Sequence, residues 1–321
     1  MAHDFAAAAR TAFQTFHQTV RAYTASWQTL TAPIVEEDPT YQEAEIFGLT
    51  TYAAQVASPT PLDMESGNSS TSAAPFERVV KLTLKEVKDN PKILESTAAA
   101  LAGLGGLTLT NAFWTTVKAA DSTAHPHTGE SWIGTTAGTG GEAVKICDNF
   151  KFFPINSVAA FTQDNLFTSA GFSAGQLTTV LAAKDEYLDK SGNPVYEEGD
   201  KPFVIVPASQ KQKALDLMKQ GGEIYDGSGL QSGSMQERAE GVIVPPGVTT
   251  STDWWTWQRK RRVSAEGKTF FTGPIIPWLR VAPSVTFTIA PASHHVYVKA
   301  YMEYAIHIAP DCDLNLQMCQ A

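Results

Sequence analysis

One segment of this sequence has the residue types and spacing of a catalytic motif, because Gly171-Phe172-Ser173-Ala174-Gly175 matches G-x-S-x-G. In that motif a sharp turn between a strand and a helix exposes a nucleophilic serine. A helical pattern follows at 174–188, and acidic residues and histidines come later in the chain, as in serine hydrolases. However, residues 165–170 make a poor buried strand, and no His-Gly-Gly-Gly segment for oxyanion donors lies upstream. The sequence therefore favours Ser173 as a helix cap, with a serine hydrolase as the alternative.

The histidines and glycines do not form a metal or cofactor motif. His125 and His127 flank a proline, and His294 and His295 are adjacent, but no nearby Cys, Asp or His completes a tetrahedral set. The glycine runs at 103–106 and 138–141 match neither the dinucleotide fingerprint nor the P-loop. We therefore expect no metal, no cofactor and no enzymatic activity.

The basic cluster at 259–262 directly follows the aromatic segment Trp254-Trp255-Thr256-Trp257. Basic residues beside aromatic ones can grip single-stranded nucleic acid. In a chain of net charge -9, a salt-bridged contact between subunits is the better interpretation, with the acidic stretch at 36–45 as its partner. The side chains assigned to this contact are Arg259, Arg261, Arg262, Glu36 and Glu37.

Composition limits the class of protein to which these residues belong. The 321 residues are 43% hydrophobic, which is enough for a core, but only 18% are charged. A weakly charged polar surface is suited to burial against other subunits. No run approaches 18 apolar residues, no signal peptide opens the chain, and Cys147, Cys312 and Cys319 cannot form a closed disulfide set. We expect neither a membrane span nor secretion, and synthesis in a reducing cytoplasm.

Aromatic residues near the N-terminus recur at helical spacing. They form one stripe that opens at Asp4, as an N-cap, and stops before Pro33. Such a helix either packs on its own domain or reaches a neighbouring subunit, and the sequence leaves both alternatives open. The stripe residues that we assign to a predicted subunit interface are Phe5, Phe13, Phe16, Tyr23 and Trp27.

The elements that follow predict an α+β fold. A polar tract at 42–74 predicts a protruding hairpin, and residues 78–85 alternate as a half-buried strand. Asp89-Asn90-Pro91 begins a long helix that runs to about Ala120, interrupted by glycines at 103, 105 and 106 that predict a bend or close packing. A helix at 174–188, a buried strand at 203–207, a helix at 210–220 and strands at 285–308 complete the pattern.

This order resembles the major capsid proteins of tailed bacteriophages, the Hong Kong 97-type fold, and among them the Mu-type head proteins. The resemblance covers most of the chain. Its motifs are the strand and helix start at 80–91, Asn111-Ala-Phe-Trp114 near the helix end, Ser173-Ala-Gly-Gln-Leu177, the turn at 189–194, and the strand at 202–207. It implies an N-terminal arm (1–45), an E-loop hairpin (46–79), a P-domain with a long spine helix (80–160), an inserted A-domain (161–285) and a return to the P-domain (286–321).

The resemblance also implies a function. The chain would be the structural subunit of an icosahedral phage head, self-assembling into hexamers and pentamers around DNA without reading its sequence. Its expected partners are copies of itself and the portal, scaffold and decoration proteins. It would be assembled in the host cytoplasm and end in the virion. A tail-tube or decoration protein is a further alternative.

The position of the first lysine bears on how such a shell is held together. Some shells of this fold form an isopeptide bond between an E-loop lysine and an asparagine of a neighbouring subunit. The first lysine here is Lys81, so the predicted arm and E-loop contain none. Subunits should therefore hold one another without this crosslink.

Overall fold

The structure is a computed structural model that divides into two compact units. It describes residues 2–23, 25–38, 40–47, 65–120, 166–167, 170–185, 201–218, 223–225, 230–232, 239–248, 252–263, 267–309 and 315–320. The first unit comprises Met1–Tyr41, Thr71–Trp114 and Ile276–His307. The second comprises Gln42–Ser70, Thr115–Ile275 and Ile308–Ala321. The predicted turn at 189–194, the glycine run at 138–141, His125 and His127 lie outside the described residues.

A four-stranded sheet forms the base of the first unit. Its strands, in spatial order, are β1 (Ile34–Val35), β13 (Ile275–Ala290), β14 (His295–Ile308) and β4 (Ala74–Thr83). Strand β4 runs antiparallel to β14, from the pair Thr83 and His295 to the pair Ala74 and Tyr304. Strand β1 runs parallel to β13. Strands β1 and β4 are therefore the two edges of this sheet.

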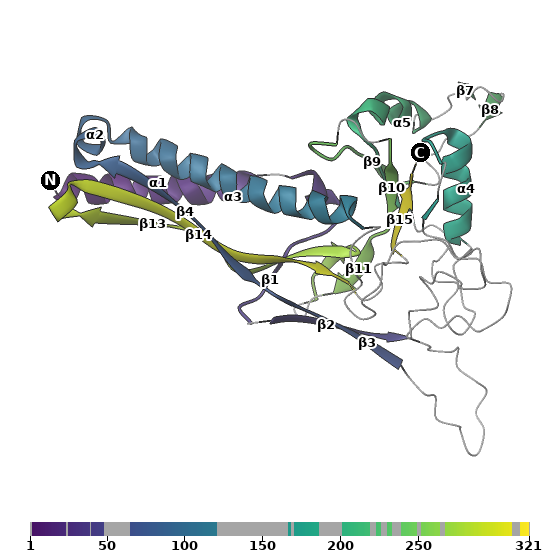
Figure 1. Cartoon of the computed structure of the whole chain (residues 1–321), viewed down its shortest axis with the longest axis horizontal. Coiled ribbons are helices and arrows are strands. Elements are labelled where there is room, and N and C mark those ends of the chain that lie inside the picture. The colour runs from purple at the N-terminus through teal and green to yellow at the C-terminus, as the bar shows by residue number, and fades with distance from the viewer. Residues whose placement is uncertain are drawn as a thin grey trace, which may run out of the picture. The chain divides into compact units, whose positions relative to one another are not determined.

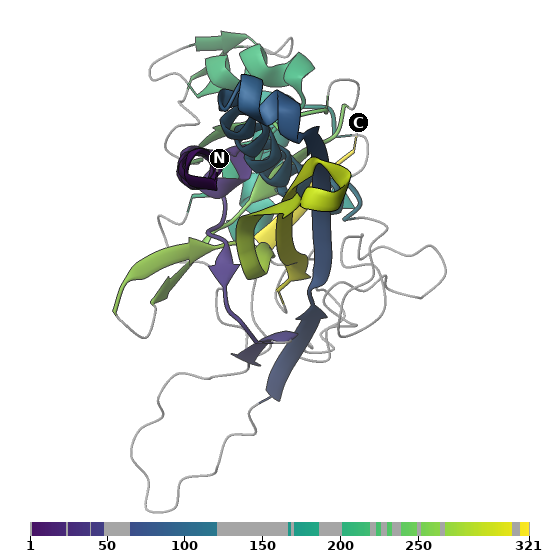
Figure 2. The same ribbon diagram turned by 90° about the vertical axis from the view of Figure 1, so that its left-hand side faces the viewer.

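Helices α1 (Ala2–Ala22) and α3 (Lys92–Lys118) lie along one face of this sheet (Figures 1 and 2). Strand β14 turns every second residue toward them, so Val296 and Val298 are buried while Tyr297 and Lys299 lie on the other face. The core between helices and sheet is aliphatic apart from one phenylalanine. Its buried residues are Ala12, Phe16, Leu82, Val87, Leu94, Ala98, Leu101, Ala102, Val285, Val296 and Val298.

The short helix α2 (Leu84–Asp89) between β4 and α3 was not predicted from the sequence. Thr83 and Glu86 form a capping box in which the backbone N–H of Glu86 donates to Thr83 Oγ1 over 3.1 Å. The backbone N–H of Thr83 donates in turn to Glu86 Oε2 over 2.8 Å. This hydrogen bond to the charged form lowers the pKa of Glu86. The predicted strand at 78–85 therefore ends at Thr83 instead of Lys85.

The long helix α3 is continuous through its three glycines, and close packing accounts for one of them, Gly106. A Cβ atom at Gly106 would lie 2.7 Å from the ring of Tyr23, whereas one at Gly103 would meet nothing within 4 Å. The Tyr23 hydroxyl lies 3.1 Å from Thr110 Oγ1, which also accepts from Trp27 Nε1 over 3.2 Å. Gly106 is therefore the point where the N-terminal segment presses against α3.

The N-terminal stripe does not form one helix. Helix α1 begins at Ala2, so Asp4 lies inside the helix and is not its cap, because the alanines around it are strong helix formers. The helix ends at Ala22, and Trp27 lies on a separate 3-10 helix, Ser26–Thr29.

A five-stranded sheet forms the base of the second unit. Its strands, in spatial order, are β5 (Leu166–Phe167), β15 (Leu316–Cys319), β10 (Trp254–Trp257), β6 (Phe203–Ile205) and β9 (Gly241–Ile243). Helices α4 (Ala174–Asp185) and α5 (Lys211–Leu217) contribute Leu177, Leu181 and Leu217 to its core. Further strand pairs are β2 (Thr40–Phe47) with β3 (Glu65–Ser72), β7 (Glu223–Tyr225) with β8 (Leu230–Ser232), and β11 (Lys260–Val263) with β12 (Thr269–Thr272).

The C-terminal part of the chain contributes to both units. Strand β14 lies in the sheet of the first unit, whereas β15 pairs with β10 and β5 in the second unit. Strand β13 belongs to the first unit from Ile276 on. These pairings of β15 join residues at least 59 positions apart, which local patterns do not encode.

The glycines of α3 offer a matched pair of substitutions. Gly103→Ala should raise the free energy of unfolding by about 0.5–1 kcal/mol, because alanine is the better helix former and has room. Gly106→Ala should lower it by about 1–3 kcal/mol, because the Tyr23 ring must move and strain its contact with Thr110. Denaturant unfolding measures both, and equal effects would contradict the close contact.

Candidate functional site

Ser173 acts as the cap of α4. Its Oγ accepts a hydrogen bond from the backbone N–H of Gln176 over 3.2 Å, and its carbonyl accepts one from Leu177 over 2.9 Å. The turn before it is fixed by its backbone carbonyls, since Trp254 Nε1 donates to Ala170 O over 2.7 Å and Lys213 Nζ donates to Phe172 O over 2.5 Å. These contacts serve packing and helix initiation.

The surroundings of Ser173 do not match a hydrolase. The strand before it, β5, has two residues and lies at the edge of its sheet. The prediction that Ser173 caps a helix is confirmed.

The tryptophans before the basic cluster are core residues. Trp254, Trp255 and Trp257 are at most 2% exposed, because β10 lies between β15 and β6. Their buried rings cannot stack on bases, so the aromatic stacking that a nucleic-acid site here would need is not provided by these tryptophans.

Two of the three arginines in the basic cluster have partners within the second unit. Arg259 pairs with Glu240, and its guanidinium lies 4.2 Å from the centre of the Phe271 ring and 4.8 Å from that of Phe203. Arg262 Nε donates to Thr272 Oγ1 over 2.8 Å, which ties β11 to β12. Arg261 is exposed on β11. Arg259 and Arg262 therefore have local structural roles, whatever contacts they make with other molecules.

The aromatic residues of the N-terminal stripe divide between core and surface. Phe16 is 1% and Trp27 2% exposed within the first unit, and Phe5 packs partly against the same core. The Tyr23 ring lies on Gly106 of α3. Phe13, by contrast, is 45% exposed and touches only the His17 ring among the aromatic contacts described. Phe13 is therefore the stripe residue with most surface left for a neighbour.

A cluster that the sequence analysis missed lies at the root of the β2–β3 hairpin. The buried His307 ring packs edge-on against Tyr41 with ring centres 4.6 Å apart, and its Nδ1 lies 2.8 Å from Thr71 Oγ1. Tyr41 also lies 5.9 Å from the ring of Trp278. These contacts fix the two ends of the hairpin to the first sheet. No local pattern predicts them, because the residues are far apart in the sequence.

The described residues hold no group of three His, Cys, Asp or Glu side chains that could bind a metal ion. Cys319 is fully buried in β15, and burial together with the Asp253 carboxylate raises the pKa of its thiol. It is therefore poorly placed to form a disulfide with another chain. Cys147 and Cys312 lie outside the described residues.

Helix α3 is long and apolar enough to cross a membrane by length and composition alone, although no span was predicted. Core helices of water-soluble proteins share these properties. One side of α3 supplies Leu94, Ala98 and Leu101 to the core of the first unit, whereas Leu104 and Leu107 stay exposed.

Comparison with solved structures identifies the fold. The chain superposes on a subunit from the mature capsid of bacteriophage PhiM1 with a TM-score of 0.50 and 9% identity, over 93% of this chain and 87% of that one. Similar coverage is found with a virus-like particle from Pyrococcus furiosus (TM-score 0.49, 7% identity, 97% and 98% covered). The capsid of an empty GTA particle gives a TM-score of 0.49 at 11% identity, with 93% and 91% covered. No family model and no curated protein matches the sequence.

The chain therefore has the Hong Kong 97-type capsid fold, as the sequence analysis predicted. Helix α3 occupies the place of the spine helix. The fold class is α+β, as the sequence analysis predicted.

Two experiments test separately whether Ser173 caps a helix and whether it is a nucleophile. A fluorophosphonate probe should not label the native protein, because Ser173 Oγ caps α4 and the strand before it, β5, has only two residues. Ser173→Ala should lower the free energy of unfolding by about 0.5–2 kcal/mol through loss of the cap, whereas Ser173→Asp should retain it. Labelling that disappears in both variants would contradict this account.

Proposed function

We propose that this chain is the structural subunit of an icosahedral bacteriophage head, assembling into hexamers and pentamers that enclose the DNA genome. The observation that carries the proposal is the Hong Kong 97-type fold, which extends over nearly the whole chain. The order of elements further supports a layout like that of Mu-type head proteins.

The first unit has the surfaces that an assembling subunit needs. Most large hydrophobic side chains that stay exposed in the described part of the chain belong to it. They are Phe13, Val35, Phe76, Val79, Leu104, Leu107 and Ile289. A two-stranded sheet is only marginally stable alone, so the β2–β3 pair, most of which belongs to the second unit, also gains from a neighbour to pack on. Many modest contacts of this kind, repeated by symmetry, build a shell.

Of the predicted contact residues, Phe13, Glu36, Glu37 and Arg261 have exposed side chains, and we propose that these meet a neighbouring subunit. Portal, scaffold and decoration proteins are the proposed partners beyond the chain itself. The protein would be assembled in the host cytoplasm and reside in the virion. A net charge of -9 fits packaging of DNA without sequence-specific binding.

Electron microscopy of the full-length protein, with sedimentation to count the species, tests this function. Closed icosahedral shells are expected, and particles from infected cells should protect DNA from nuclease. Tubes would indicate a tail-tube protein instead. A chain that stays monomeric at high concentration would contradict the proposal.

The absence of lysine before Lys81 gives a further expectation. The hairpin cannot form the isopeptide crosslink, because lysine is the side chain that supplies the attacking amine. Particles boiled in detergent with reductant should therefore run as one band near 34.6 kDa. A ladder of reductant-resistant multimers would show that another lysine reaches a neighbouring subunit.

A further inference from the structure

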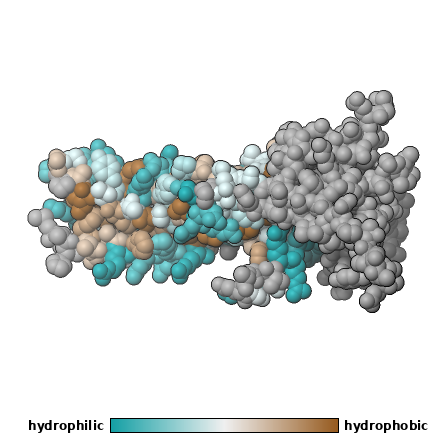
Figure 3. All heavy atoms as spheres, turned by 90° about the horizontal axis from the view of Figure 1, so that it is seen from below, coloured by the Kyte–Doolittle hydropathy of each residue, from teal (hydrophilic) through white to brown (hydrophobic). Residues whose placement is uncertain are grey.

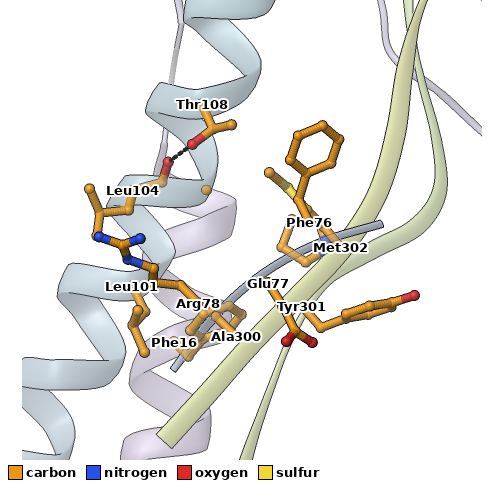
Figure 4. Close-up of a pocket in the computed structure, with 12 residues that line it drawn as sticks. Phe16, Phe76, Glu77, Arg78, Leu101, Leu104, Thr108, Ala300, Tyr301 and Met302 are labelled. Atoms are coloured by element: carbon orange, nitrogen blue, oxygen red, sulfur yellow. Dashed lines mark hydrogen bonds between the residues drawn. The ribbon is translucent and has the colours of Figure 1, made fainter. Parts of the chain in front are cut away.

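An apolar groove of about 270 Å³ opens between α3 and one edge of the first sheet. Leu101, Leu104 and Gly105 of α3 form one wall, Met302 of β14 lies on the sheet side, and Phe76 and Arg78 of edge strand β4 form the rim (Figure 4). Seen from below, this unit also shows a band of hydrophobic residues between hydrophilic margins (Figure 3).

Ring stacking holds one side chain of the groove's rim in place, and another carries a positive charge that no described ion pair neutralises. Phe76 is 37% exposed and is held by stacking on Tyr304, with ring centres 4.3 Å apart. Arg78 is exposed, and Figure 4 shows its guanidinium beside Leu104. Its neighbour Glu77 is paired with Lys299 on the other face of the sheet, and Arg78 makes no ion pair with any described residue. An apolar groove with an unpaired arginine at its mouth fits a ligand that combines an apolar group with a carboxylate.

The chain itself carries a segment with this chemistry at the opposite edge of the same sheet. Val35 of β1 is 58% exposed, the largest value among the exposed large hydrophobic side chains described. It is followed by Glu36, Glu37 and Asp38, all exposed and without an ion pair to any described residue. Segment and groove lie three strand spacings apart, roughly 14 Å, so the segment cannot fill the groove of its own chain while β1 stays paired.

We propose that the groove is the docking site for residues 35–38 of a second copy of this chain. Val35 enters beside Leu104 and Phe76, and the carboxylates of Glu36 and Glu37 face Arg78. Residues 35–38 and the groove lie on opposite edges of one sheet, so the contact joins two different surfaces of the subunit. Such a contact is heterologous, and heterologous contacts can close into rings. The inference rests on the proposed shell function and names the contact that would join subunits within a hexamer or pentamer.

Charge reversal of the full-length protein tests this contact. Arg78→Glu should raise the concentration needed for half-maximal assembly by about tenfold or more, since each reversed contact recurs around the ring. The double change Glu36→Lys and Glu37→Lys should do the same. Combining all three should restore assembly toward the native level. Lys81→Glu is the matched control, because it reverses an exposed charge on the same strand but on the other face of the sheet.

The outcomes separate this contact from the shell function itself. Rescue by the triple variant, with a smaller effect of each reversal at about 1 M salt, supports the contact. Native shells together with normal assembly of Arg78→Glu would overturn it and leave the shell function standing. Loss of assembly in Arg78→Glu without rescue would mean that the groove receives something other than residues 35–38, which also overturns the proposal. Failure of the native protein to assemble would overturn both.

Discussion

The apolar seam between two helices and one face of a four-stranded sheet is the interaction on which the rest of this subunit depends. Phe16 of α1, Leu94 and Leu101 of α3, and Val296 and Val298 of β14 meet there. Each buried side chain of this size contributes about 1.5–3 kcal/mol. Without the seam, one face of the long strands β13 and β14 would be exposed to solvent, and α3 would have no sheet to pack against.

The seam also determines what remains for assembly. Phe16 is buried in the seam. In the N-terminal segment after Phe16, Tyr23 packs on Gly106 and Trp27 is buried. Phe16 and Trp27 are therefore part of the subunit's own core, whereas Phe13 of the same N-terminal stripe stays exposed. What the seam leaves exposed are the two edges of the sheet and the outer side of α3. Hydrophobic side chains at those places, unlike Phe16, are free to meet another molecule.

Much of this architecture could be predicted from local patterns. The alternation at 80–82 gave the correct faces, with Leu82 buried and Lys81 exposed. Asp89-Asn90-Pro91 marked the start of α3 to within a few residues. The buried strand Phe203–Ile205 and helix α4 were also found. These features depend on side-chain period and capping, which neighbouring residues determine.

Other features could not be predicted because they depend on distant partners. The sequence analysis noted Trp254 to Trp257 only as aromatic residues beside a basic cluster, but strands on both sides bury this segment. The position of β15 and the cluster of Tyr41, Thr71 and His307 likewise join distant parts of the chain. The groove beside Arg78 is lined by residues of two helices and three strands, so no single sequence motif predicts it.

Hydrogen exchange of the protein, compared between dissociated subunits and assembled shells, tests the central claim most directly. The account predicts that amides of α1, α3 and β14 are protected in both states, because the seam belongs to one subunit. Amides at the edge of β4 and those of Glu37 and Asp38, beyond the pairing of β1 with β13, should gain protection only on assembly. If α1 became protected only in shells, the N-terminal helix would be an arm that binds a neighbour, and the account would be contradicted.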